Sequence, residues 1–398
     1  MDLKRIFLKD ACPTSIGGQA IMEGIMMRGP KRTAIAIRLP NGKIHMKTQP
    51  TDMPPKWAQI PLVRGVVNFV VSLISGTKVL MYSADVLEAN YPEDYEKDKF
   101  DIWVEEKLGK EKAWNILLAL SVVLALAFSI VIFMLMPSAV VGWCEAFTNN
   151  IIVLNLIEGV VRMLIFILYI WLIAKMEDIK RVFQYHGAEH KTIHCFENGL
   201  ELTPENAQSF YTLHPRCGTS FMMFVLIIAI IVHVFMGWPN VWMRVGMRLA
   251  ALPLIAGISY ELLKWAGRSN NPIVEFLSLP GIYLQKLTTK TPDFEQLEVA
   301  IAAMKAVLPL ESEEEEANTP YFVGMCDLNG KPVEGEVEYY DPKENPRGPE
   351  YKKPEETAET NASNAGESIP TEDDMTKAIE ESMSVFEKHD AEKKGNNE

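Results

Sequence analysis

The densest group of chemically capable side chains lies in the middle of the chain, where four of the seven histidines, His186, His190, His194 and His214, fall within 29 residues. The core of this group is the segment His186-Gly-Ala-Glu189-His190. On a helix, positions i, i+3 and i+4 share one face, so these three side chains would point the same way. Two imidazoles at i and i+4 can bind one metal ion, and a carboxylate between them, here Glu189, can act as general base on water at the metal. The pattern HxxEH is the inverted form of the HExxH metalloprotease motif.

Three further side chains of metal-ligand type, His214, Cys217 and Glu261, occur at the ends of apolar segments. In soluble proteases with the inverted motif, the third ligand is a glutamate that follows further along the chain. We therefore expect a zinc site in which the two histidines of the HxxEH motif are ligands and one of these three side chains completes the set. In the alternative interpretation, the histidines lie at a membrane interface and hydrogen-bond to lipid headgroups or to a soluble domain.

Four long apolar segments must hold these residues in place. The first, residues 116–136, has 21 residues without a charge and ends before Pro137. At 1.5 Å per residue this is about 31 Å, the thickness of a bilayer core. The other three segments are residues 152–174, 221–238 and 245–263. The sequence therefore predicts an α-helical polytopic membrane protein with about four transmembrane helices.

Lysine and arginine flank these segments unequally. Three lysines lie at 107–112, before the first segment, and five basic residues lie between 175 and 216, whereas residues 137–151 contain none. Because cytoplasmic loops carry an excess of Lys and Arg, both termini and the His-rich loop 175–220 are expected in the cytoplasm. The candidate metal site would then lie at the cytoplasmic face of the membrane.

The rest of the chain is divided by its composition. Residues 1–58 are expected to form a small β-rich cytoplasmic domain, and residues 59–112 an amphipathic helix followed by a linker. The helix, at 61–83, lies along the membrane or enters it. The four-span membrane domain takes up residues 113–308. Strands are expected at 21–27, 34–39 and 43–48, a hairpin turn at Pro40-Asn41-Gly42, and a further cytoplasmic helix at 294–307.

The negative charge of the chain is concentrated at its C-terminal end. The 398 residues include 39 Lys and Arg against 52 Asp and Glu, a net charge of −13. From Glu311 to Glu398 there are 25 acidic and 9 basic residues, a net charge of −16, which leaves +3 for the first 310 residues. Residues 309–398 are therefore expected to be an acidic, disordered tail. Since no long Lys/Arg stripe exists to neutralise phosphates, no nucleic-acid partner is expected.

Several polar residues inside or beside the apolar segments need partners. Glu158 and Arg162 are four residues apart and are expected to pair with each other. His233 is expected to be a buried, hydrogen-bonded histidine. Glu23 stands in the run Ile21-Met-Glu-Gly-Ile-Met-Met27, which is typical of core packing, so its charge requires a partner. The five cysteines form no CxxC pair and no regular spacing, which argues against a disulfide framework.

Four stretches together resemble a known family. They are Gly17-Gly-Gln-Ala-Ile-Met-Glu-Gly-Ile-Met-Met-Arg-Gly-Pro30, Tyr185-His-Gly-Ala-Glu-His-Lys191, His214-Pro-Arg-Cys-Gly-Thr-Ser-Phe221 and Gly257-Ile-Ser-Tyr-Glu261. The chain resembles the YqhQ-like family of bacterial membrane proteins, a domain of unknown function labelled a predicted metal-dependent enzyme, over residues 12–308. The resemblance implies a protein of the bacterial cytoplasmic membrane.

The leading hypothesis is a zinc-dependent hydrolase at the cytoplasmic face, acting on a membrane-embedded peptide or a lipid-linked molecule. Its partners would be the lipid bilayer and a membrane-protein or lipid-linked substrate. The alternative is a non-catalytic membrane factor that assembles or scaffolds other membrane proteins. A transporter is a third option, but the apolar segments show no inverted repeat.

Overall fold

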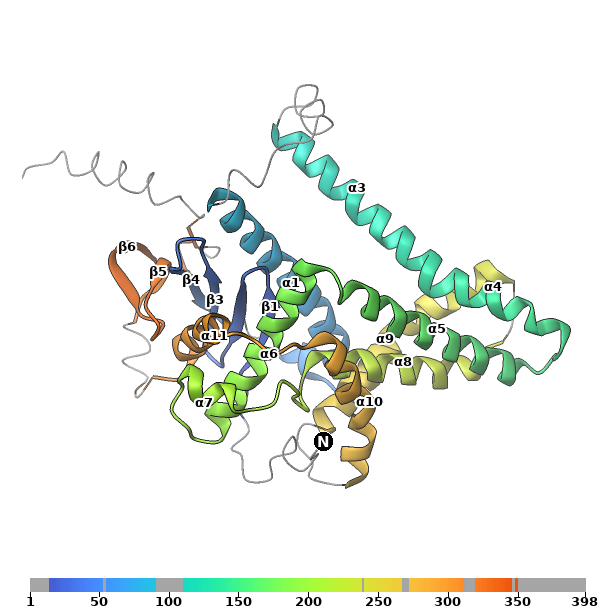
Figure 1. Ribbon diagram of the computed structural model, residues 1–398. Coiled ribbons are helices and arrows are strands. Elements are labelled where there is room, and N and C mark those ends of the chain that lie inside the picture. The colour runs from blue at the N-terminus through green and yellow to red at the C-terminus, as the bar shows by residue number, and fades with distance from the viewer. Residues whose placement is uncertain are drawn as a thin grey trace, which may run out of the picture. The chain divides into compact units, whose positions relative to one another are not determined.

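The computed structural model of the chain describes residues 14–52, 55–90, 110–237, 240–266, 272–310, 312, 319–345 and 348–349. Within these residues, an antiparallel sheet carries helices on its faces, and further helices are long and apolar (Figure 1). The six strands follow one another across the sheet in chain order: β1 (Gly17–Ile21), β2 (Gly24–Arg28), β3 (Arg32–Arg38), β4 (Ile44–Pro50), β5 (Tyr321–Cys326) and β6 (Pro332–Tyr340).

The N-terminal strands differ from the prediction at one point. The strand expected at 21–27 is confirmed only for residues 24–27, which lie in β2, because the chain turns at residues 22–23 and Ile21 ends a separate strand, β1. Glu23 adopts a left-handed φ of 48° in this turn. The adjacent Gly24 has no room for a side chain, since a Cβ would lie 2.2 Å from the carbonyl oxygen of Ala36. The strands expected at 34–39 and 43–48 are confirmed as β3 and β4.

Strands β5 and β6 correct the prediction that the whole of residues 309–398 is disordered. Residues 44–47 of β4 pair with residues 323–326 of β5, which in turn pairs with β6. The apolar residues of β5 hold the segment in place, because Phe322 packs into the core on one face of the sheet and Met325 into the core on the other. The prediction missed β5 because its six residues contribute little to the average composition of a long acidic segment. Residues beyond 349 lie outside the described part of the chain.

Both faces of strands β2, β3 and β4 are covered, so these strands lack the alternation of a half-exposed sheet, whereas β6 is mostly exposed. Helices α6 (Glu177–Glu197) and α11 (Phe294–Val307) pack on one face, where Met27 is buried, and α7 (Pro204–Gln208) packs against these two helices. The second half of α1 (Val63–Asn90) packs on the other face, where Met26 is buried. The methionine-rich run is thus core packing, as expected. The helix predicted at 294–307 is confirmed, and a capping box of Asp293 and Gln296 begins it.

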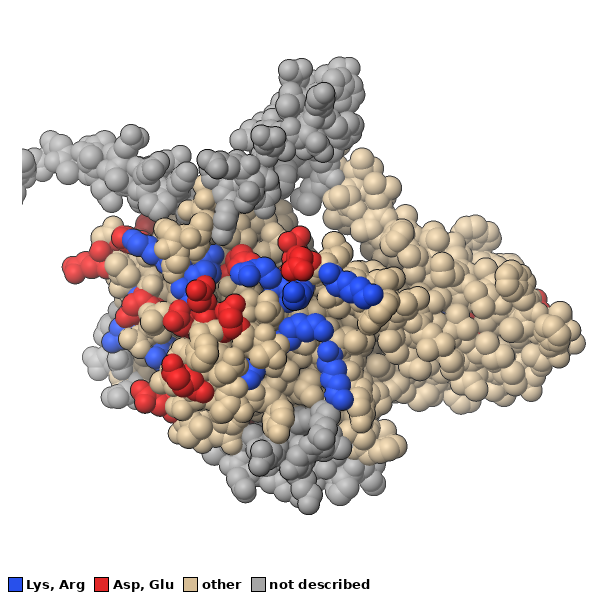
Figure 2. Space-filling model, viewed as in Figure 1, with Lys and Arg blue, Asp and Glu red and all other residues tan. Residues whose placement is uncertain are grey.

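Four segments of the described chain are long and apolar enough to cross a membrane: α1, residues Leu120–Ala146, α5 (Ile151–Ile173) and α9 (Val241–Ala266). Helix α8 (Gly218–Val234) is equally apolar but shorter, with 17 residues. Three of the four predicted spans therefore coincide with long apolar helices, the fourth is α8, and the predicted amphipathic helix is the long helix α1. Figure 2 shows charged side chains gathered over the sheet, α6 and α11, whereas the face of the apolar helices turned to the viewer is nearly without charge.

The first apolar segment continues beyond Pro137, where the sequence predicted its end. It consists of α3 (Lys110–Ile130), the π-helical turn η3 (Val131–Leu135), α4 (Met136–Gly142) and the short turn η4 (Cys144–Ala146). Pro137 occupies the first turn of α4, where a missing N–H is tolerated, and the wider π turn precedes it. Helix α10 (Pro272–Thr288) was not predicted; it packs mainly against α8.

Candidate metal centre

Helix α6 carries the predicted motif and is set apart from the apolar helix that precedes it. Helix α5 ends at Ile173, and a turn through residues 174–176 redirects the chain before α6 begins at Glu177. The segment predicted as a His-rich loop is therefore mostly helical. Arg181 binds both carboxylate oxygens of Glu23, which supplies the partner that Glu23 requires and ties α6 to the turn between β1 and β2.

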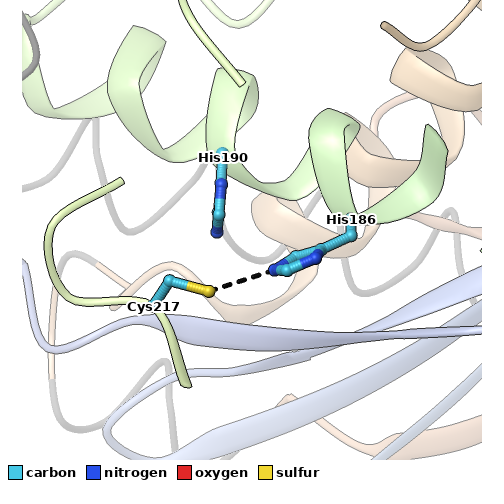
Figure 3. A group of neighbouring side chains, drawn as sticks. All are labelled: His186, His190 and Cys217. Atoms are coloured by element: carbon cyan, nitrogen blue, oxygen red, sulfur yellow. Dashed lines mark hydrogen bonds between the residues drawn. The ribbon is translucent and has the colours of Figure 1, made fainter. Parts of the chain in front are cut away.

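The structure brings His186, His190 and Cys217 together. One ligand atom from each lies within 4.8 Å of the others, and the Nε2 atom of His186 is 3.1 Å from the Sγ atom of Cys217. The two histidines are one helical turn apart on α6, and the cysteine stands at the start of α8. Figure 3 shows the two imidazoles and the thiol directed toward a common point. Ligand bonds of about 2.0–2.1 Å to nitrogen and 2.3 Å to sulfur require only such a short separation between donors.

Backbone carbonyl groups orient both imidazoles. The Nδ1 atom of His186 lies 2.8 Å from the carbonyl oxygen of Thr288, and that of His190 lies 2.6 Å from the carbonyl oxygen of Thr212. A carbonyl oxygen only accepts, so each Nδ1 carries the proton and donates it. Each Nε2 atom is therefore left with a lone pair on the side of Cys217. Metal-binding histidines in proteins are commonly held by this kind of outer hydrogen bond.

Cys217 is the N-cap residue of α8. Its Sγ atom accepts a hydrogen bond from the backbone N–H of Thr219 at 3.3 Å. The sulfur therefore lies at the positive end of a 17-residue helix, a position that favours an anionic ligand atom. Because the Nε2 atom of His186 is an acceptor, the Cys217 thiol can donate its proton to that nitrogen.

Close packing holds these elements against one another. A Cβ on Gly187 would lie 2.0 Å from the carbonyl oxygen of Lys290, so α6 contacts the segment after α10 through a position that only glycine can fill. The side chain of Gln285, on α10, binds both the backbone N–H and the carbonyl oxygen of His214, each at 2.8 Å. Helix α10 thus holds the loop segment that leads from His214 to Cys217.

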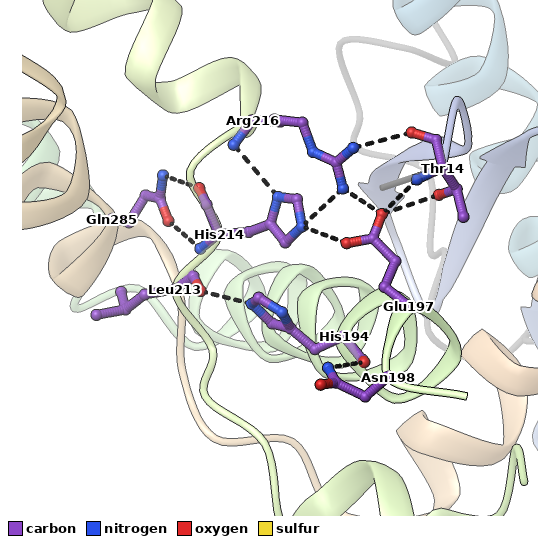
Figure 4. Close-up of polar contacts among 8 residues, drawn as sticks. All are labelled: Thr14, His194, Glu197, Asn198, Leu213, His214, Arg216 and Gln285. Carbon is purple, nitrogen blue, oxygen red and sulfur yellow. Dashed lines mark hydrogen bonds and ion pairs between the residues drawn. The ribbon is translucent and has the colours of Figure 1, made fainter. Parts of the chain in front are cut away.

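His214 belongs to a second group, with His194 and Glu197, which lies next to the first (Figure 4). The ring of His214 is 4.6 Å from that of His194 and 5.6 Å from that of His190, measured between centroids. The carboxylate of Glu197 accepts from the guanidinium of Arg216 and from the backbone N–H and hydroxyl group of Thr14, at 2.8 and 3.0 Å.

This second group already contains a cation. Arg216 pairs with Glu197 and lies 3.5 Å from the Nε2 atom of His214, where a metal ion would meet its positive charge. The ring of His194 is engaged with the carbonyl oxygen of Leu213 at 2.9 Å. Of the two groups, the geometry therefore favours the one with Cys217 for a metal and makes the other a network of hydrogen bonds and ion pairs.

Burial sets the protonation of both groups. It lowers the pKa of His190 and of His214 to about 4, and it lowers the pKa of His194. For Glu197, burial acts to raise the pKa, but hydrogen bonds from His214 and Thr14 and the charge of Arg216 outweigh it and hold the pKa at about 2. His190, His194 and His214 are thus neutral at pH 7, the form in which imidazole binds metals.

Glu189, the predicted general base, is held by β1. One of the Glu189 carboxylate oxygens accepts a hydrogen bond from the backbone N–H of Gly18 at 2.7 Å, and burial raises the pKa of Glu189.

The side chain of Lys191 is buried and donates to the carbonyl oxygens of Gln208 and Phe210, both at 2.6 Å. Lys191 therefore stabilises the end of α7.

Glu261 is not part of either group, which corrects its prediction as a ligand. Both its carboxylate oxygens bind the guanidinium of Arg64, and one also accepts the backbone N–H of Leu62. The contact joins the start of α1 to α9, where Gly65 and Gly257 let the two helices approach closely. Sequence spacing gave no indication of this partner.

The fold and the site define a protein with long apolar helices and a largely buried group of possible metal ligands. Comparison with known proteins then gives its family. The family model described as "Protein of unknown function (DUF1385)" matches residues 60–310. The uncharacterized protein YqhQ of Bacillus subtilis (strain 168) is 35% identical over 320 residues, which cover 78% of this chain and 98% of that protein. The chain therefore belongs to the YqhQ-like family, DUF1385. No solved structure matches it.

Two contributors to the site were absent from the predicted set. Glu197 follows His194 by three residues, a helical spacing that could have indicated their common face. Gly18 contacts Glu189 from a strand 171 residues away in the chain, and only its place in a Gly-Gly pair hinted at a close approach.

Proposed function

We propose that this protein is a zinc-binding membrane hydrolase whose metal is held by His186, His190 and Cys217. The observation that carries the proposal is the common orientation of the two imidazoles. Both donate Nδ1–H to a backbone carbonyl group and leave Nε2 facing the cysteine sulfur. Three protein ligands of nitrogen and sulfur type suit zinc and leave one position for a substrate or water, which is typical of catalytic rather than structural zinc sites.

Bound zinc would supply Lewis-acid chemistry for the hydrolysis of a peptide, ester or amide. In this proposal Glu189 is the general base, because it is the carboxylate placed between the two histidine ligands on α6. The Gly18 N–H holds one of its oxygens and so orients the other. The resulting site is buried and is enclosed by α6, the start of α8 and the end of α10.

The site's neighbours favour a membrane-associated substrate. Cys217 caps the apolar helix α8, and α10 exposes Phe276, Leu277 and Tyr283 while its C-terminal end holds His186 and His214. A peptide or a lipid-linked molecule lying at the membrane surface would approach the site there. The proposal places the protein in the bacterial cell membrane, with both termini and the metal site in the cytoplasm.

Metal content tests the proposal most directly. The full-length protein is purified in detergent without chelators and its metal is measured by plasma mass spectrometry, beside His186→Ala/His190→Ala and Cys217→Ala variants. We expect near-stoichiometric zinc in the unmodified protein and at least a tenfold loss in both variants, which must still elute as folded species. Hydrolysis is then sought with peptide, ester and lipid-linked substrates, and Glu189→Gln should keep the metal and lose activity. A metal-free unmodified protein would overturn the proposal and favour the scaffolding function instead.

A further inference from the structure

Two pairs of an aromatic and a basic side chain lie at the ends of apolar helices. Trp171, in the last turn of α5, is 45% exposed, and Lys175 follows it by four residues. Tyr283, near the C-terminal end of α10, is 55% exposed, and Lys286 follows it by three residues. The same arrangement, a ring and then a lysine about one helical turn later, therefore ends two separate helices. We call these four residues the lysine–aromatic surface.

In each pair the ammonium group lies over the ring. The Nζ atom of Lys175 is 3.5 Å from the ring centroid of Trp171, and that of Lys286 is 4.6 Å from the ring centroid of Tyr283. Such a contact positions a cation without neutralising its charge. Both lysines are exposed, so each ammonium group can still bind an anion.

Packing between α5 and α10 brings the two pairs together. Ile173 of α5 belongs to one apolar cluster with Leu284 and Leu287 of α10. In the sequence, Ile173 stands between the two residues of the first pair, and the leucines stand next to the two residues of the second. The pairs therefore flank one contact between helices. Figure 2 shows Lys and Arg side chains along the boundary where the charged surface meets the uncharged helices.

The two lysines differ from the charged groups inside the apolar helices. There, Glu158 pairs with Arg162 at 2.9 Å, as the sequence predicted, and Arg162 lies 3.2 Å from the Nδ1 atom of the buried His233. Lys175 and Lys286, by contrast, form no ion pair with any carboxylate of the described chain. Their charges are therefore available to a ligand.

The neighbouring charges do not cancel those of the two lysines. The basic residues in the first turns of α6 are paired with Glu177 at 3.6 Å and with Glu23. Of the adjoining carboxylates, Asp178 is exposed and has no ion-pair partner among the described residues, so one negative charge stands against two lysines. The surface thus keeps a net positive charge.

Apolar side chains continue from the charged groups. Leu172 of α5 is 51% exposed, and Phe276 and Leu277 of α10 are 70% and 43% exposed. A small soluble anion would use only the ammonium groups, whereas an amphiphile would use the exposed rings and apolar side chains as well. Tryptophan and tyrosine are enriched where proteins meet the membrane–water interface, and lysine at that level attracts anionic lipids.

We propose that the lysine–aromatic surface binds the anionic headgroup of a phospholipid, whose acyl chains lie along the exposed apolar side chains of α5 and α10. The surface needs no metal to bind this lipid. It adjoins the candidate metal centre, because Thr288, two residues after Lys286, holds His186 through its carbonyl oxygen.

Thermal unfolding of the full-length protein in mixed micelles tests the surface. The protein is purified in a non-ionic detergent without phosphate and is titrated with phosphatidylglycerol. Phosphatidylcholine with the same acyl chains is the headgroup reference, and sodium phosphate at matched ionic strength tests a free anion. Lys175→Gln/Lys286→Gln removes both charges, and Lys175→Arg/Lys286→Arg keeps them. The matched control, Lys331→Gln/Lys343→Gln, removes two exposed lysines on either side of β6.

We expect phosphatidylglycerol to raise the unfolding temperature more than phosphatidylcholine does. Its apparent affinity should fall about tenfold or more in the variant with two glutamines at 175 and 286, and should stay within about twofold in the arginine variant and in the control. Zinc content, measured on the same preparations, should be equal in all of them, which separates this site from the metal centre.

Three results would each overturn the proposal. The first is an equal response to the two lipids, and the second is a response to sodium phosphate as large as that to phosphatidylglycerol, which would identify a site for free anions. The third is an unchanged affinity for phosphatidylglycerol in Lys175→Gln/Lys286→Gln.

Discussion

The backbone N–H of Gly18 donates to the carboxylate of Glu189 at 2.7 Å, across 171 residues of sequence. This contact joins the first strand of the sheet to the helix that carries the candidate metal ligands. It also explains why residue 18 is glycine. A Cβ there would lie 2.9 Å from the Glu189 side chain and 2.7 Å from the carbonyl oxygen of Met26.

Gly18→Ala should therefore destabilise the protein by roughly 1–3 kcal/mol, because the added methyl group forces apart β1 and α6. Gly17→Ala is the matched control, since no atom lies within 4 Å of its Cβ position. The free energy of unfolding in detergent is measured for both. Equal stability of the two variants would contradict the close approach of Gly18 and Glu189.

The two histidine groups should respond differently to substitution. Glu197→Gln removes the carboxylate that pairs with the guanidinium of Arg216, so it should lower the free energy of unfolding by about 1–3 kcal/mol. The zinc content should stay unchanged. Cys217→Ser should lower the zinc content at least tenfold, because the sulfur ligand is lost. Metal analysis and thermal unfolding on the same preparations check both results. Loss of zinc in Glu197→Gln would contradict the proposal, because it would place the metal in the group of His194, Glu197 and His214.

Acid should weaken the contact between the sheet and α1 at His45. Burial, aided by the charge of Lys47, lowers the pKa of His45 to about 3, and its Nε2 atom is 2.7 Å from the hydroxyl group of Tyr82. A folded-state pKa below the unfolded value of about 6.5 means that the neutral form is favoured in the fold. Its contribution is therefore complete above pH 6.5 and is lost as the pH falls from 6.5 toward 3.

His45→Gln removes this titration. Between pH 7.5 and 5.5, the unmodified protein should lose about 1.4 kcal/mol more stability than the variant, since one group is then one pH unit below its unfolded pKa. The other buried histidines titrate equally in both proteins. Unfolding temperatures measured at both pH values give the difference, and parallel losses would show that His45 does not resist protonation.

The sheet also predicts which helices cross the membrane. Helices α6 and α11 pack on the sheet, so the chain must return to the same side before each of them. Helix α1 ends against the sheet through Val86 and Leu87. We therefore expect α1 to dip into the membrane without crossing it, the segment Leu120–Ala146 to cross with α5, and α8 to cross with α9.

Membrane-impermeant thiol labelling of intact cells checks this arrangement. In a Cys144→Ser background, a cysteine introduced at Asn149 or Gly237 should be labelled from outside, and one introduced at Ser209 or Asn329 should not. The Cys144→Ser protein without an added cysteine gives the background. Labelling at Ser209 from outside would show that α6 and α7 do not share the cytoplasmic side.

Helical spacing was sufficient to predict two of the three candidate ligands. The i, i+4 relation placed His186 and His190 on one face because both lie on a single helix, whose geometry is local. Cys217 entered the set only as one of three choices, and Glu261 was wrong. Whether α8 or α9 meets α6 depends on how separate helices pack, and the Arg64 partner of Glu261 lies 197 residues away.

For the fold as well, elements marked by a local sequence pattern were predicted, and contacts between residues far apart in the chain were not. Apolar runs predicted three long helices and the shorter α8, because membrane-length segments are marked by composition. Strand β1 was missed apart from Ile21, since the turn at Glu23 that separates it from β2 lacks the usual residues. Strand β5 was missed because its pairing with β4 bridges the whole helical region.

That pairing has a consequence for how the protein is made. Between the end of β4 and the start of β5 lie 270 residues, which include every apolar helix described. At 5–20 residues per second, a ribosome needs roughly 14–54 s to synthesise them. During this interval the edge of β4 has no partner strand, and the sheet is completed only after the last helix has left the translation machinery. Completion of the sheet thus reports, within the molecule itself, that the whole helical region has been synthesised.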